Sequence, residues 1–346
     1  MARLRYCGLR ATLALAALAV PSLAACGGSD NSGTGSAEGG PIAFKRYFDP
    51  AADTWSAVFT TGADGSGEKQ LTHPPEGTSD DQPAWTADGK LIVFTRCPSG
   101  KLCHTYVMKA DGSELRPIGK VCPGTATETS CADESYATPS PDGKRVALTA
   151  STGVVRIDPT GEGWIENSAL TLMNLDGTGR RTVRQLSDNQ GDLTGAAFSP
   201  DGKRLVFEQL NSAFASPAGR AVFVINVDGS GLKQLTPWEE NSGDNPDWSR
   251  DGKWILFHSH VDQASAQGQF FVIRPDGSGR RQVTHFPAGT HLASASFSPD
   301  GKSIVISKGP EGTNNIDVWT IRLDGSGLTR VTKSARWESA PDWGTG

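Results

Sequence analysis

The chain has 346 residues, a formal net charge of −5, and 21% charged against 36% hydrophobic residues. This composition is typical of a water-soluble globular protein and excludes a multi-pass membrane protein. The acidic balance argues against a general nucleic-acid binder. Glycine is abundant, at 41 residues, and without a strict period of three this abundance indicates either disorder or many tight turns.

The first 25 residues have the pattern of a secretory signal. Arg3, Arg5 and Arg10 precede an apolar run over 11–20, which is shorter than the ~20 residues that span a bilayer. The sequence Leu-Ala-Ala-Cys at 23–26 follows at once and resembles the cleavage site of bacterial lipoproteins. That resemblance implies a lipoprotein signal peptide over 1–25, with Cys26 as the lipidated N-terminus of an exported chain anchored to the cell membrane.

The next segment, 26–40, lacks both periodicity and large apolar residues, so we expect a lipidated flexible tether there. Export permits disulfides, and four further cysteines follow the tether: Cys97, Cys103, Cys122 and Cys131. Three pairings are open to them. The short loops closed by Cys97–Cys103 and Cys122–Cys131 favour that pairing.

From residue 41 onward the chain repeats one unit of about 50 residues. One motif, Asp-Gly followed by Ser or Thr, begins at Asp64, Asp111, Asp176, Asp228, Asp276 and Asp324. A second motif, Asp-Gly-Lys, alternates with it and begins at Asp88, Asp142, Asp201, Asp251 and Asp300. Apolar runs of strand length flank both motifs, and Asp-Gly is a strong signal for a tight hairpin turn. Each unit therefore reads as four short antiparallel strands, A to D.

The two ends of the repeat region together supply the strands of one complete unit. Residues 41–44 match a strand B with no strand A before it, and residues 340–343 match a strand A with no strand B after it. We therefore predict an all-β, six-bladed β-propeller of four-stranded antiparallel blades over 41–346. Pairing of the N- and C-terminal strands closes this ring and leaves no long open edge.

The aromatic-Ser-Pro-Asp-Gly-Lys turn of each unit and its later Asp-Gly-Ser/Thr turn resemble the TolB-type, WD-repeat-like propeller. The resemblance covers about 41–343 and implies the propeller fold. TolB has a further N-terminal α/β domain for which this chain leaves no room, so the resemblance does not carry over a role in the Tol system.

The repeat also separates two faces of the disc. The Asp-Gly turns join strand A to B and strand C to D, and they define the turn face. The longer connections, such as 151–168 and 119–136, join B to C and D to the next A; they define the long-loop face, where binding is expected. Trp85, Trp248 and Trp343 recur in strand A and are expected between blades. The candidate binding residues at the channel mouth and on the long-loop face are Lys45, Arg46, Asp81, Arg96, Glu208, Asp244, His258, His260, Lys308, Trp164, Trp238 and Trp337.

No signature of a hydrolase elbow, a zinc protease or a P-loop occurs in the sequence. We therefore expect a non-catalytic, monomeric scaffold without a cofactor or nucleic-acid partner, which binds an envelope protein or peptide. Two alternatives stay open: a propeller lyase or hydrolase acting on a polysaccharide, and a sensor of a small molecule or glycan. Weak candidates for a transition-metal site are His258, His260, His285 and His291.

Overall fold

The computed structural model describes residues 39–49, 54–122, 131–157, 163–187, 190–211, 219–260, 268–313 and 315–345. The predicted signal peptide, Cys26 and most of the predicted tether lie outside these ranges. Among the described residues, no helix has the length and apolar character needed to cross a membrane.

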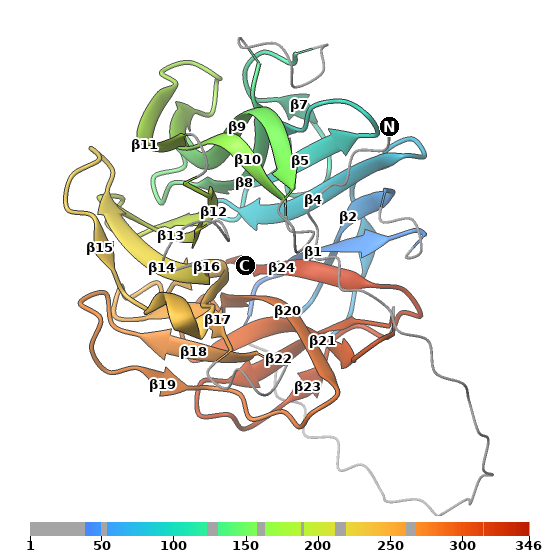
Figure 1. Ribbon diagram of the computed structural model, residues 1–346. Helices are drawn as coiled ribbons and strands as arrows, with labels where there is room; N and C mark the ends of the chain where they lie inside the picture. Colours follow the sequence, from blue (N-terminus) through green and yellow to red (C-terminus); the bar gives the residue numbers. More distant parts are fainter. Residues whose placement is uncertain are drawn as a thin grey trace, which may run out of the picture.

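The described residues form six four-stranded blades arranged in a ring, with the first strand of each blade nearest the centre (Figure 1). One sheet of eight strands contains blades 1 and 2, which a single bridge between Ser56 and Ser79 joins. Blade 1 comprises β24 (Glu338–Trp343), β1 (Ile42–Tyr47), β2 (Ser56–Thr61) and β3 (Lys69–Gln70). Blade 2 comprises β4 (Thr78–Trp85), β5 (Leu91–Pro98), β6 (His104–Lys109) and β7 (Arg116–Pro117).

The other four blades are separate antiparallel sheets. Blade 3 comprises β8 (Asp133–Pro139), β9 (Arg145–Ile157), β10 (Gly163–Asn174) and β11 (Arg181–Ser187), and blade 4 comprises β12 (Asp192–Phe198), β13 (Arg204–Asn211), β14 (Gly219–Asn226) and β15 (Lys233–Gln234). A short 3-10 helix, η1 (Trp238–Glu240), leads to blade 5, with β16 (Gly243–Trp248), β17 (Ile255–Ser259), β18 (Gln269–Ile273) and β19 (Arg281–Gln282). Blade 6 comprises β20 (Thr290–Phe297), β21 (Ser303–Pro310), β22 (Asp317–Arg322) and β23 (Thr329–Arg330).

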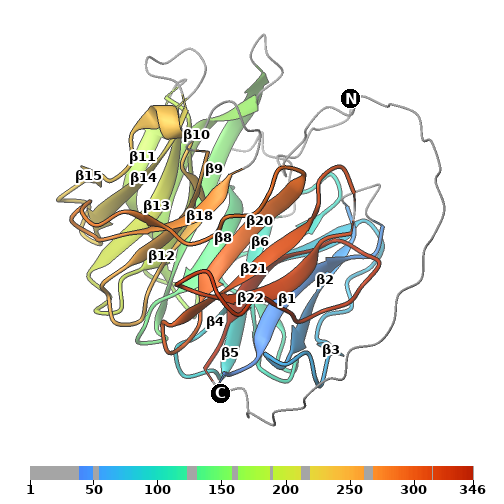
Figure 2. The same ribbon diagram turned by 90° about the horizontal axis from the view of Figure 1, so that it is seen from below.

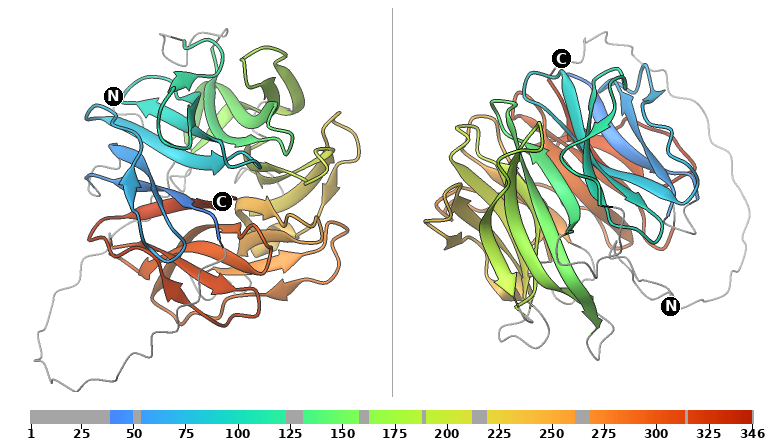
Figure 3. Two further views of the ribbon diagram at one scale, coloured as in Figure 1. Left: turned by 180° about the vertical axis from the view of Figure 1, so that it is seen from behind. Right: turned by 90° about the horizontal axis from the view of Figure 1, so that it is seen from above.

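The predicted ring closure is present in blade 1. Strand β24 pairs antiparallel with β1, with Ile42 opposite Trp343 and Arg46 opposite Glu338. The Trp343 indole nitrogen also donates a hydrogen bond to the Gly40 carbonyl, at 3.0 Å. The two ends of the repeat region are therefore held in one sheet, and they lie side by side in both views of Figure 3.

The hydrophobic core is divided into six clusters, one between each pair of neighbouring blades. Trp85 packs between blades 1 and 2, Trp248 between blades 4 and 5, and Trp343 between blades 6 and 1. The three tryptophans are at most 9% exposed, which confirms their predicted place between blades. Removing such a side chain costs about 3–5 kcal/mol of stability.

The Asp-Gly turns fold through their own side chains. In the turn at Asp276, one carboxylate oxygen accepts hydrogen bonds from the backbone N–H and the hydroxyl of Ser278, at 2.9 and 2.7 Å. Gly277 has φ +83°, which a residue with a β-carbon rarely adopts. In the Asp-Gly-Lys turns, the preceding Ser or Thr hydroxyl donates to the aspartate instead, as Ser249 does to Asp251 at 2.7 Å.

One connection differs from its prediction. The stretch 151–168, expected as an irregular loop, lies mostly within the long hairpin β9–β10, where Ser151 pairs with Ser168 and Ile157 with Gly163. This hairpin extends from the long-loop face, on the side of the ring opposite the C-terminus (Figure 2). Four of the six residues at 152–157 are β-branched, which favours strand over loop and explains the extension.

Each innermost strand contains an irregularity in its register with the next strand. In β4 the register shifts between Asp81 and Ala84, and in β16 it shifts between Gly243 and Asp247. Gln82 and Asn245 lie within these bulges at positive φ, +51° and +63°. A bulge bends its strand and redirects side chains, so these strands present polar groups to the channel in mid-strand.

Candidate functional site

Three of the predicted binding residues meet where blades 4 and 5 approach the long-loop face. Glu208 lies in the buried part of β13, Asp244 is the second residue of β16, and His258 lies in β17. The Asp244 backbone N–H donates to Glu208 Oε2 at 2.6 Å, and Asp244 Oδ2 lies 3.1 Å from His258 Nδ1. These three residues and Arg220, at the start of β14, are called the blade 4–5 cluster.

Arg220 joins the two carboxylates of the blade 4–5 cluster. Its Nη1 atom lies 2.9 Å from Glu208 Oε1 and 3.6 Å from Asp244 Oδ1. The charge of Glu208 raises the pKa of the Arg220 guanidinium, so it is permanently cationic. The sequence analysis missed Arg220, because it follows a variable connection and the other units hold no arginine at that place.

The blade 4–5 cluster is partly open to solvent. The Asp244 side chain is 41% exposed and that of Arg220 is 34% exposed, yet burial is the largest single influence on the pKa of Asp244. Burial acts to raise this pKa, but the hydrogen bond and charge of His258, together with the charge of Arg220, outweigh it and hold the pKa below its usual range. Burial raises the pKa of Glu208, against the opposing charge of Arg220. Asp244 is therefore ionised and accessible from the channel.

His258 itself is enclosed. The residue is 4% exposed, its ring lies 5.4 Å from that of Phe270, and it meets the His260 ring edge-on at 4.9 Å. A β-carbon on Gly268 would overlap Nε2 and Cε1 of the imidazole. With Nδ1 facing Asp244 and Nε2 covered by the Gly268 backbone, the ring is placed to position Asp244 and lacks an open side for a substrate.

A second pair of predicted residues meets between blades 1 and 2. Lys45 Nζ lies 2.8 Å from Asp81 Oδ1 and donates to the Tyr47 hydroxyl at 2.6 Å. Lys45 is only 3% exposed, so its charge is neutralised inside the protein. Breaking such a buried pair costs about 3–5 kcal/mol; both residues are therefore structural as well as close to the channel.

The other predicted basic side chains, Arg46, Arg96 and Lys308, form ion pairs or lie over aromatic rings. Arg46 pairs with Glu338 at 2.5 Å and with Glu68 at 2.7 Å. Arg96 pairs with the fully buried Asp80 at 2.6 Å. Lys308 Nζ lies 4.5 Å above the Trp319 ring and 5.1 Å from that of Phe286. Similar arginine–carboxylate pairs in the other blades, absent from the sequence predictions, are Arg180–Glu134, Arg280–Glu240 and Arg330–Asp317.

Two of the predicted aromatic anchors, Trp238 and Trp337, pack against other aromatic rings. Trp238 packs against Phe223, with ring centroids 5.4 Å apart. Trp337 lies 5.9 Å from the Tyr47 ring and 5.5 Å from that of His291. The Trp164 side chain lies outside the described side chains. In the described part of the chain, no three His, Cys, Asp or Glu side chains gather to hold a metal, so the four candidate histidines do not form a centre there.

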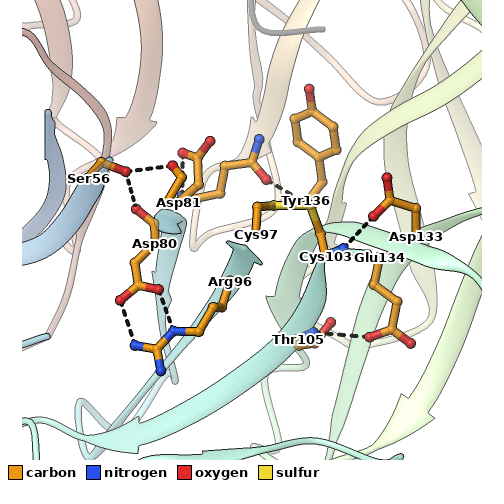
Figure 4. Close-up of a disulfide and its surroundings, with 12 residues drawn as sticks. Ser56, Asp80, Asp81, Arg96, Cys97, Cys103, Thr105, Asp133, Glu134 and Tyr136 are labelled. Carbon is orange, nitrogen blue, oxygen red and sulfur yellow. Dashed lines mark hydrogen bonds and ion pairs between the residues drawn. A yellow bond between two sulfur atoms is a disulfide. The ribbon is translucent and has the colours of Figure 1, made fainter. Parts of the chain in front are cut away.

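Disulfides brace the long-loop face at blades 2 and 3. Cys97 is bonded to Cys103, and Cys122 to Cys131, which is the pairing that the sequence favoured. Around the first bond, the Cys103 backbone N–H donates to Asp133 at 2.5 Å (Figure 4). The Tyr136 backbone N–H donates to the Gln82 side chain at 2.9 Å (Figure 4). These contacts cross from blade 2 to blade 3 and fix the loop ends at the channel.

Comparisons with known proteins agree with this geometry. Residues 164–345 match the family model of the TolB β-propeller domain. Dipeptidyl-peptidase 5 of Porphyromonas endodontalis is 36% identical over 114 residues, which are 33% of this chain and 16% of that relative. TolB from Acinetobacter baumannii has a TM-score of 0.67 at 19% identity, covering 88% of this chain and 66% of that one. A chain of a nidogen/laminin complex has a TM-score of 0.63 at 12% identity, covering 88% and 98%. These structural likenesses establish the fold alone.

Proposed function

The chain belongs to the TolB β-propeller family, and from that premise we propose that it is a non-catalytic scaffold which binds a protein or peptide in the cell envelope through its long-loop face. The observation that carries the proposal is the blade 4–5 cluster, where an ionised Asp244 and a cationic Arg220 stay accessible side by side. Paired opposite charges suit the backbone and charged side chains of a peptide better than an apolar ligand.

The cross-links at blades 2 and 3 of the long-loop face support binding. The loop ends at blades 2 and 3 are tied by two disulfides and by hydrogen bonds between blades. A surface that is already ordered loses little conformational entropy when a partner docks. The nidogen/laminin neighbour is a propeller named for a protein complex, which is consistent with this use of the fold.

The environment of His258 in this cluster favours binding over catalysis. A histidine that acts as a general base needs an open ring nitrogen within hydrogen-bond reach of a substrate, and the Nε2 side of His258 is covered by Gly268. Dipeptidyl-peptidase 5 is named as a peptidase, but the matched segment is 16% of its length, so its activity is not carried over to this chain.

We further propose that the protein is exported and held at the membrane by a lipid on Cys26. Two disulfides support an oxidising compartment, and the sequence at 23–26 supplies the lipidation pattern. The Cys26→Ala variant is expected to leave the membrane fraction for the soluble exported fraction. Retention of this variant in the membrane fraction would contradict the anchor.

Site-specific photocrosslinking tests the binding face in the native envelope. A photoreactive residue replaces Glu239, exposed beside the blade 4–5 cluster, or Lys253, exposed on the turn face of the same blade. We expect a discrete crosslinked protein from position 239 only, and its loss when Asp244→Asn and Arg220→Gln are combined. A crosslink from position 253 alone, or one unaffected by the double change, would place the partner elsewhere.

A further inference from the structure

The channel has a second mouth, on the turn face, and it has a different chemistry. A cavity of about 360 Å³ opens there, and all six blades contribute to its wall. Its rim includes Ala87, Pro141, Pro200 and Arg250, which belong to the turns between the first and second strands of blades 2 to 5. The aromatic residues that end the innermost strands form the rest of the wall, together with Asp247 and Asp342.

The two aspartates are fixed by the neighbouring blades. Asp247 Oδ2 accepts the Phe297 backbone N–H at 2.9 Å, and Asp342 Oδ2 accepts the Trp85 backbone N–H at 2.7 Å. In both cases the donor belongs to the next blade around the ring. Their carboxylates therefore keep their positions in the cavity wall without help from a ligand.

The carboxylates lack a counter-ion among the described side chains. Neither aspartate forms an ion pair there, although Arg250 at the rim is close enough to influence both. Burial raises the pKa of Asp247 to about 7, and the charge of Asp342 acts in the same direction. Burial also raises the pKa of Asp342. Two partly buried acids thus compete for one proton or one cation in a mouth lined mainly by aromatic and proline side chains, with Ser140 and Arg250.

We propose that the turn-face mouth is a binding site for one organic cationic group, such as a lysine side chain or another primary amine, held between Asp247 and Asp342. The volume suits a single side chain, and the aromatic and proline walls suit the alkyl stem of an amine. A calcium ion would require six or more oxygen ligands, whereas backbone N–H groups already occupy oxygens of both carboxylates. This site lies at the opposite end of the channel from the blade 4–5 cluster and goes beyond the function proposed above.

The test compares two small probes on the whole chain. Nα-acetyl-lysine amide is titrated at pH 8 and followed by calorimetry and by the fluorescence of Trp85, Trp248 and Trp343, which line the mouth. Nα-acetyl-norleucine amide, which has the same stem without the charge, is the matched control. We expect a dissociation constant on the order of 1 mM for the lysine probe and at least about tenfold weaker binding of norleucine. Equal affinity of the two probes would overturn the proposal.

Two variants then locate the site. Asp247→Asn removes one charge and is expected to weaken the lysine probe about tenfold; an unchanged affinity would refute the placement. Arg250→Gln removes the competing charge at the exposed rim, without a buried contact, and is expected to tighten binding about threefold. Binding of the lysine probe should also weaken from pH 8 to pH 5.5, as Asp247, whose pKa is raised to about 7, takes up a proton. If calcium chloride binds more tightly than the lysine probe and displaces it, the amine assignment is wrong.

Discussion

The pH dependence of stability offers a quantitative test of the buried charge at Asp247. Its pKa is raised from 3.8 to about 7, chiefly by burial. A carboxyl whose pKa is higher in the folded protein stabilises the fold at low pH, and this contribution is lost as the pH rises toward the folded pKa. Between pH 5 and pH 8 the loss covers about two pKa units, or about 2.5 kcal/mol at 1.36 kcal/mol per unit.

The perturbation is Asp247→Asn, which keeps the shape and removes the titration. The amide still accepts one backbone N–H through its oxygen but loses the second acceptor, at a cost of about 1 kcal/mol that does not depend on pH. We therefore expect the free energy of unfolding of the wild type to fall relative to that of the variant by about 1–2.5 kcal/mol between pH 5 and pH 8. The lower figure allows for solvent screening of this charge at the open mouth.

Urea unfolding measures this difference, with tryptophan fluorescence as the signal and with the disulfides intact. The matched control is Asp276→Asn in an exposed turn, where hydrogen bonds from Ser278 lower the pKa of the aspartate. The control should leave the slope between pH 5 and pH 8 as it is in the wild type. The reasoning fails if Asp247→Asn shows the same slope as the wild type, because the group would then titrate alike in the folded and unfolded chains.

Three further outcomes follow from the contacts described above. The Gly268→Ala variant places a methyl group in the His258 ring, so the free energy of unfolding should fall by about 1–3 kcal/mol; an unchanged urea midpoint would show that the ring moves freely. Hydrogen bonds from Ser side chains lower the pKa values of the turn aspartates Asp276 and Asp228, so the ionised aspartates stabilise the fold. This stabilisation is lost below pH 4, as the aspartates take up protons. The acid limb of Asp276→Asn should accordingly be shallower than that of the wild type in a circular-dichroism titration. Deleting 338–346 removes β24 from blade 1 and should abolish the near-ultraviolet signal of packed tryptophan; a native spectrum would refute the importance of ring closure.

The fold was predictable because its signals are local. Each Asp-Gly turn carries its own hydrogen-bond acceptor and its own glycine, as at Asp276 and Gly277. The position of these turns fixes the strands on either side, and the count of turns fixes the number of blades. Hairpin length is less local: the strands β9 and β10 continue past the expected loop start at Ser151, because their backbones go on pairing beyond it.

The candidate site was predictable only in part, because side-chain direction at a strand end depends on the neighbouring blade. Adjacent residues show this clearly: Lys45 reaches Asp81 in blade 2, whereas Arg46 turns to Glu338 within blade 1. Sequence reasoning grouped both as channel residues. The signal for Asp247 and Asp342 was present but not used, since both occupy the position before the strand-A aromatic, where other units have small or hydroxyl residues.

The pairing of β24 with β1 imposes an order on folding. Ile42 and its neighbours have one strand partner that is near in sequence and another that begins at Glu338, almost three hundred residues away. Long-range pairing of this kind slows folding, because the loop entropy is lost before the contact is gained. During synthesis or transport, blade 1 therefore stays incomplete until residue 343 has emerged. Until then, the edge of β1 that will pair with β24 has no partner. A factor that shields the edge of β1 during that interval would raise the yield of the closed ring, and the need for one should grow with the time the chain takes to emerge.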